Sequence, residues 1–219
     1  NMTKKKTRHS LGKDYTKIKK FDSTGRKKFK KITSKNIIIP KISPTTYEAK
    51  RNDIQKLKNG VLLVRLSTNE KLINYYLDNL ELEKANSEIE KQKKENESII
   101  ESFQKKWSFC PVYFFYSNHY SKIEQNEFQH VFKDDKKTKL SAIERRNLKN
   151  NFLIAYLGKT PGNMNFHALV LTNQKLQQLP QAMPRYVRTY EGFWFLERKI
   201  EKAIAILQKK LNFYWLREK

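Results

Sequence analysis

Residues 107–117 read WSFCPVYFFYS and form the longest run of aromatic and β-branched residues in the chain. A charge-rich, helix-like segment precedes the run, and the polar turn Ser117-Asn118-His119 follows it. Continuous apolar runs of strand length are typical of strands buried on both faces of a sheet. The run therefore predicts a buried central strand, with the rest of the chain covering its two faces.

Further strands are predicted on both sides of this run. Residues 61–67 (VLLVRLS) are a second candidate for a central strand. Residues 152–157 (FLIAYL) and 166–171 (FHALVL) are separated by GKTPGN, whose turn-forming residues predict a hairpin. Residues 185–190 are expected to add an edge strand.

Helical periodicity fills the intervals between these strands. From residue 69 to 106, apolar residues recur at spacings of three and four, with a phase slip that predicts a break near residues 79–81. Gln92 and Asn96 interrupt the second stripe, so the middle of that helix is expected to leave the core. Shorter helical patterns occupy residues 45–58 and 141–149, and a last helix is predicted over residues 194–215.

The element order is strand, long helix, strand, helix, strand, strand, helix. A crossover of this length between the first two strands implies a parallel pair with a right-handed connection. The predicted fold class is therefore α/β, with a mixed sheet of four to five strands flanked by helices. Thioredoxin-like folds have the same element order, although the segment Ser67-Thr68-Asn69-Glu70 after the first strand contains no redox cysteine pair.

Positive charge is concentrated at the start of the chain. The formal net charge of the 219 residues is +24, and 14 of the 46 Lys and Arg residues fall within the first 40, beside only Asp14 and Asp22. Residues 1–36 contain too few apolar residues to form a core and are predicted to be a basic extended tail. Residues 37–219 are predicted to be a single α/β domain.

The tail indicates a polyanionic partner, such as nucleic acid, lipid head groups or an acidic protein. Aromatic residues lie among its cations, a combination that can neutralise phosphates and stack on bases, or enter a lipid interface. The predicted binding residues are Lys4, Lys5, Lys6, Arg8, Lys17, Lys19, Lys20, Arg26, Lys27, Lys28, Lys30 and Lys31. A possible second patch contains Arg185, Tyr186, Arg188 and Tyr190. Packing at the end of a helix would explain these residues equally well.

The sequence contains no motif specific to one reaction. Cys110 could act as a nucleophile with His119 or His167 as base, but its position within an apolar strand favours a core residue. The four histidines lack metal-ligand spacing, and Gly158-Lys159-Thr160 lacks the upstream glycine of a phosphate-binding loop and is interpreted as a hairpin turn. No catalytic residue, metal or cofactor is predicted.

Three segments together resemble an uncharacterised family of small proteins from Bacteroidota. They are residues 60–68 (GVLLVRLST), 103–117 (FQKKWSFCPVYFFYS) and 186–192 (YVRTYEG), and the similarity extends over roughly residues 60–215. Members of this family look as though they are made with signal peptides, so the resemblance implies a periplasmic or cell-envelope location. Asn1, which precedes Met2, is then either the start of a processed chain or a tag remnant. The resemblance implies no activity and no site.

The first functional hypothesis is a non-enzymatic accessory or structural subunit of a large bacterial cell-envelope assembly. Its body would dock on partner proteins, and its tail would follow an acidic protein or lipid surface. The alternative is a cytoplasmic ribonucleoprotein or nucleic-acid-binding subunit that uses the same tail. An enzyme with a site near Cys110 and His167 is a third possibility. No run of apolar residues in the sequence is long enough to span a membrane.

Overall fold

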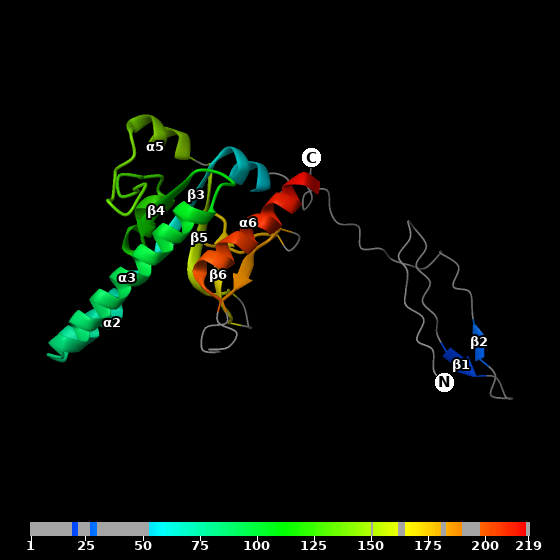
Figure 1. Ribbon diagram of the computed structural model, residues 1–219, viewed down its shortest axis with the longest axis horizontal. Helices are drawn as coiled ribbons and strands as arrows, with labels where there is room; N and C mark the ends of the chain where they lie inside the picture. Colours follow the sequence, from blue (N-terminus) through cyan, green and yellow to red (C-terminus); the bar gives the residue numbers. More distant parts are fainter. Residues whose placement is uncertain are drawn as a thin grey trace. The chain divides into compact units, whose positions relative to one another are not determined.

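The fold was obtained as a computed structural model (Figure 1). The structure describes residues 19–21, 27–29, 53–149, 151–161, 165–180, 183–189 and 198–217. The chain divides into two units, residues 1–42 and 43–219. In the first unit, strands β1 (Lys19–Phe21) and β2 (Lys27–Phe29) form an antiparallel pair that the sequence pattern did not predict.

The second unit is an α/β fold built on one mixed sheet, as predicted. Its strands are β3 (Val61–Leu66), β4 (Val112–Tyr116), β5 (Phe152–Lys159), β6 (His167–Thr172) and β7 (Tyr186–Arg188), in the order β4-β3-β5-β6-β7. Strand β3 pairs in parallel with both β4 and β5, whereas β5, β6 and β7 are successively antiparallel. The predicted parallel pair and hairpin are both confirmed.

The prediction that residues 107–117 form the central strand is wrong. Strand β4 begins only at Val112 and lies at one end of the sheet, while β3 occupies the interior position between β4 and β5. Pro111 cannot donate a backbone hydrogen bond, and Trp107 and Phe109 instead pack into the core ahead of the strand. Phe114 exchanges two backbone hydrogen bonds with Phe132, so the outer edge of β4 is covered.

Helices cover both faces of the sheet. On one face, α3 (Leu82–Lys106), α6 (Ile200–Arg217) and the helical residues 53–59 pack on side chains such as Leu62 and Val64. On the other face, Val61 and Leu63 pack with α4 (Tyr120–Glu124) and α5 (Ala142–Leu148). The short helix η2 (Ser117–His119) connects β4 to α4. The alternation of apolar residues along β3 thus supplies both clusters of the core.

The predicted break in the long helical region is confirmed. Helix α2 (Glu70–Asp78) ends before α3 begins at Leu82, and the two helices form a hairpin that extends beyond the sheet (Figure 1). The expectation that Gln92 and Asn96 leave the core is wrong for Asn96, which is buried. Both amide groups donate hydrogen bonds to the carbonyl oxygen of Ser67, at 2.9 Å for Asn96, and so fasten α3 to the end of β3.

Candidate functional site

Four of the predicted tail cations lie in the β1–β2 pair. The register places Lys20 opposite Lys28 and Lys27 opposite Phe21, while Lys19 pairs with Phe29. The other eight predicted tail residues lie outside the described residues: Lys4, Lys5, Lys6, Arg8, Lys17, Arg26, Lys30 and Lys31.

The predicted second patch is divided by the structure. Tyr186 and Arg188 line a hollow of about 280 Å³ between β7 and α6, together with Arg198 and Lys210. Arg185 does not line this hollow, because its Nη1 donates to Gln178 Oε1 at 3.0 Å. Tyr190 lies outside the described residues.

The hollow combines three cationic residues, Arg188, Arg198 and Lys210, and none of its lining residues within the described part of the chain is acidic. The Arg188 guanidinium lies 3.4 Å from the centre of the Phe166 ring, and Arg198 Nη1 donates to the Arg188 carbonyl oxygen at 2.6 Å. These contacts hold the two arginine side chains in one arrangement, in which they can bind an anionic group. Lys210 was not predicted as a binding residue, although it shares one face of α6 with Ile206 and lines the hollow.

The α2–α3 hairpin exposes the largest group of apolar side chains outside the core. Helix α2 has no buried residue, although its apolar stripe resembles that of a core helix. Six large apolar residues of the hairpin are 41 to 86 % exposed, and we name them the hairpin surface: Leu72, Tyr75, Leu77, Leu80, Leu82 and Ile89. The sequence pattern identified the stripe but not its exposure, since periodicity does not show whether a second element packs on it.

Leu80 at the turn of the hairpin combines a strained backbone with an exposed apolar side chain. Its backbone has φ 58°, in the left-handed region, and its side chain is 86 % exposed. The N–H of Glu81 donates to Tyr76 O at 2.8 Å and that of Leu80 to Leu77 O at 3.0 Å, which is the Schellman pattern of a helix end. Glycine is the usual residue at the position of Leu80, because a side chain is strained there. Folding of the isolated chain therefore gains nothing from a leucine in place of a glycine at this position.

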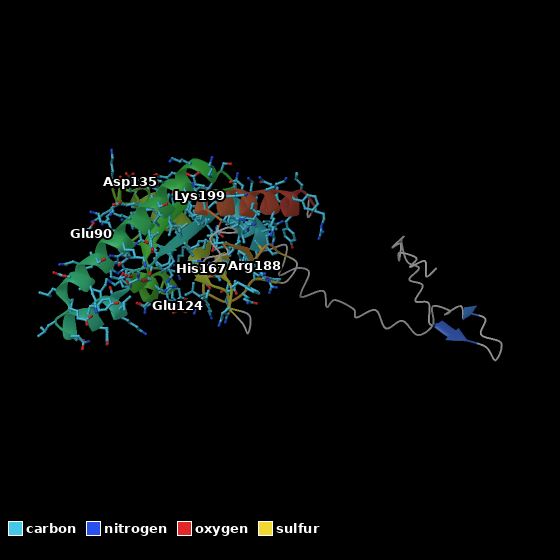
Figure 2. The ribbon with its side chains drawn as sticks, turned by 60° about the horizontal axis from the view of Figure 1, so that its bottom comes forward. Glu90, Glu124, Asp135, His167, Arg188 and Lys199 are labelled. Atoms are coloured by element: carbon cyan, nitrogen blue, oxygen red, sulfur yellow. The ribbon has the colours of Figure 1, made fainter. Side chains whose placement is uncertain are left out.

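The hairpin is also acidic within a strongly basic chain. Residues 70–90 contain six Asp or Glu and two Lys, a net charge of −4, whereas the whole chain carries +24. Exposed acidic residues therefore surround the hairpin surface, and Figure 2 labels one of them, Glu90. A complementary surface would present an apolar centre with cations around it.

Polar contacts hold the base of the hairpin. Asn69 Nδ2 donates to Glu88 Oε1 at 2.9 Å and joins the start of α2 to α3. Asn118 Nδ2 donates to Glu70 Oε1 at 2.8 Å and joins the same helix to the end of β4. With the Asn96 contact to Ser67, these bonds fix the direction in which the hairpin leaves the sheet.

Cys110 and His167 do not form a catalytic pair. Cys110 precedes β4 at the amino end of the parallel strands, whereas His167 pairs with Lys159 at the opposite end. The strand registers separate them by about eight residues along the sheet, or roughly 25 Å. Burial raises the pKa of the Cys110 thiol to about 12, although the hydrogen bond from Trp107 and the charge of Lys58 oppose that shift. The thiol is therefore protonated and poorly nucleophilic at neutral pH.

Two other histidines lie together at the carboxyl end of β4. The rings of His119 and His130 stack with their centres 3.9 Å apart, and Lys122 Nζ lies 3.0 Å from His130 Nε2. Burial, with the neighbouring His130 and Lys122, lowers the pKa of His119, and Glu70 opposes that shift. Within the described residues, no group of three or more His, Cys, Asp or Glu side chains could hold a metal ion.

Comparisons with known proteins returned no match for this chain among family models, curated proteins or solved structures. No helix in the described part of the chain is long and apolar enough to cross a membrane.

Proposed function

We propose that this protein is a non-enzymatic accessory subunit that docks on a partner protein through the hairpin surface. The observation that carries the proposal is Leu80, an 86 % exposed leucine in left-handed backbone geometry at the end of the hairpin. The left-handed backbone at Leu80 lowers the stability of the isolated subunit, and its exposed side chain contributes little to folding, so a compensating contact in a complex explains its presence.

The occupant of the hairpin surface is a protein with an apolar groove bordered by Lys and Arg. Amphipathic helices dock in apolar grooves through residues spaced three and four apart. Leu72 and Tyr75 of α2 have such a spacing, and Leu80 follows the helix at the turn of the hairpin. Burial of a leucine or tyrosine side chain contributes about 1.5–3 kcal/mol, so a few anchors suffice for stable binding. The net charge of −4 on residues 70–90 disfavours a second copy of the same hairpin as the partner.

A second contact would involve the cationic groups. The tail lysines and the hollow lined by Arg188, Arg198 and Lys210 would hold an acidic protein or lipid surface. The resemblance to a Bacteroidota family that is made with signal peptides supports a bacterial cell-envelope assembly in the periplasm as the setting. The body and the tail would then contact the assembly at separate places.

The docking role is tested by the size of the native complex. In size-exclusion chromatography of extracts from cells that make the protein, the wild type should elute in a large complex. A variant with Tyr75→Ser, Leu80→Gly and Leu82→Ser should be lost from that complex and elute as a smaller species. Ile143→Ser with Phe213→Ser is the matched control, because these residues are comparably exposed apolar residues outside the hairpin. Retention of the hairpin variant would contradict the proposal, and a purified wild-type dimer that the variant abolishes would show that the occupant is a second copy.

Nucleic-acid binding is a second candidate function, favoured by the three cationic side chains that line the hollow, Arg188, Arg198 and Lys210. Fluorescence anisotropy with labelled RNA and DNA should then show affinity that falls steeply as salt rises, with a slope reduced by about one in Arg188→Gln or Lys210→Gln. Binding that is absent, or that does not respond to salt, would eliminate this candidate.

A further inference from the structure

The carboxyl edge of the sheet contains a cavity of about 370 Å³ that the docking role does not use. Ser67, directly after β3, and Leu157, near the end of β5, line the cavity from two neighbouring parallel strands. His167 at the start of β6 and Thr189 just after β7 line it from the same edge. Helix α3 contributes the buried side chain of Asn96. The cavity is thus formed by elements of the rigid sheet and by one helix packed on it.

The cavity lies where the connections of the sheet change direction. The chain leaves β3 toward β4 and leaves β5 toward β6, although β3 and β5 are neighbours. Parallel neighbours with diverging connections leave a crevice outside their carboxyl ends, and open α/β sheets bind ligands in such crevices. The position of this cavity therefore follows from the strand order.

Cationic groups outnumber carboxylates around the cavity. Arg198 and Lys199, immediately before α6, line it with His167, while Glu95 is the acidic residue among the described residues of the lining (Figure 2 labels His167 and Lys199). Arg65 borders the cavity as well, but the alternation of β3 directs its side chain to the opposite face. The nearby first turn of α6 adds the partial positive charge of a helix start.

Hydrogen bonds hold these groups in one arrangement. The N–H of Thr189 donates to His167 O at 3.0 Å, and the N–H of Arg198 donates to Thr189 O at 2.7 Å. The Thr189 hydroxyl donates to His167 O at 3.1 Å and lies 2.9 Å from His167 Nδ1. Because the hydroxyl has a single proton, which it donates to His167 O, it accepts a hydrogen bond from Nδ1. A site ordered in this way loses little conformational freedom on binding.

We propose that this cavity binds a small organic phosphate, with the phosphate near Lys199, Arg198 and His167. Cavities that take small molecules usually enclose roughly 300–1,000 Å³, so this one fits a compact ligand and leaves room beyond a phosphate ion. Lysine, arginine and hydroxyl donors are common phosphate ligands. Ile99 and Ile200 line the remaining wall and would contact the organic part of the ligand.

Isothermal titration calorimetry on the full chain tests this site with three phosphate esters of sugars or sugar alcohols, called sugar phosphates below: ribose 5-phosphate, glucose 6-phosphate and glycerol 3-phosphate. The unphosphorylated parent compounds and inorganic phosphate form separate arms. Lys199→Gln removes a lining cation, and Lys202→Gln is the matched control, because Lys202 is an exposed lysine of α6 that does not line the cavity. Neither substitution touches the hairpin surface, so failure here is independent of the docking proposal.

At least one sugar phosphate should bind more tightly than inorganic phosphate, and its parent compound should not bind. Lys199→Gln should weaken this binding by about ten- to a hundredfold, since a hydrogen bond to a charged group contributes about 1.5–3 kcal/mol, while Lys202→Gln should change it little. The proposal is overturned if no sugar phosphate binds at millimolar concentration. It is also overturned if inorganic phosphate binds as well as the sugar phosphates, or if the two substitutions weaken binding equally.

Discussion

Replacement of Leu80 should separate the stability of this protein from its docking. A non-glycine residue in left-handed geometry costs about 1–2 kcal/mol, and glycine at the same position avoids this cost but loses about 0.5–1 kcal/mol through its more flexible unfolded state. Leu80 is 86 % exposed, so loss of its side chain removes only about 0.3 kcal/mol of burial. Leu80→Gly should therefore be as stable as the wild type or slightly more stable.

The sharper comparison is between Leu80→Gly and Leu80→Ala, because both remove the apolar side chain and only the second keeps Cβ. The glycine variant should be more stable by about 1 kcal/mol, which corresponds to a melting temperature higher by roughly 2–4 °C in a chain of this size. Leu80→Asn should resemble the glycine variant, since asparagine tolerates this conformation. Urea and thermal unfolding of the three purified variants provide the measurement. An alanine variant as stable as the glycine variant would show that Leu80 carries no backbone strain.

Three further predictions concern the fold and its titratable groups. Gly60→Ala should destabilise the protein by about 1–3 kcal/mol in urea unfolding, because a Cβ there would lie 2.1 Å from the carbonyl oxygen of Asn151; unchanged stability would contradict this packing. The pKa of His119 is lowered in the folded protein, so the unfolded chain binds the proton more readily and stability should fall as the pH drops through the ordinary histidine value near 6.5. In thermal unfolding at pH 7 and pH 5, His119→Gln should reduce that fall. An identical fall in both proteins would refute the assignment. Cys110, with a pKa of about 12, should react with iodoacetamide at pH 7.5 far more slowly in the folded protein than in urea, and equal rates would show an accessible thiolate.

Local patterns in the sequence were sufficient for most of the fold. The β5–β6 hairpin followed from two apolar runs around a turn, and the break after α2 followed from a phase slip, since both depend on neighbouring residues. The position of β4 could not be predicted in the same way. Strand order depends on contacts between distant segments: β4 pairs with β3 on one side and meets Phe132 on the other, and of its five residues Phe114 and Phe115 are buried.

The candidate sites were predicted less completely than the fold. Tyr186 and Arg188 were identified from a cluster of cations and rings, but Lys210 joins them only through the packing of α6 on β7. Asn96 was expected to be solvated because the periodicity of α3 cannot reveal the backbone carbonyl group of Ser67 that accepts its hydrogen bond. The exposure of α2 was missed for a related reason, because an apolar stripe shows which face of a helix is hydrophobic and not what covers it.

The docking role of the hairpin surface is tested most directly by photo-crosslinking in cells that make the protein. A photoreactive amino acid at position 80 should form one discrete crosslinked species, whose partner has an apolar groove bordered by Lys and Arg. Tyr75→Ser should reduce the yield of this species, and the same photoreactive group at position 202 on α6 should not form it. Equal crosslinking from positions 80 and 202, or none from position 80, would contradict the account.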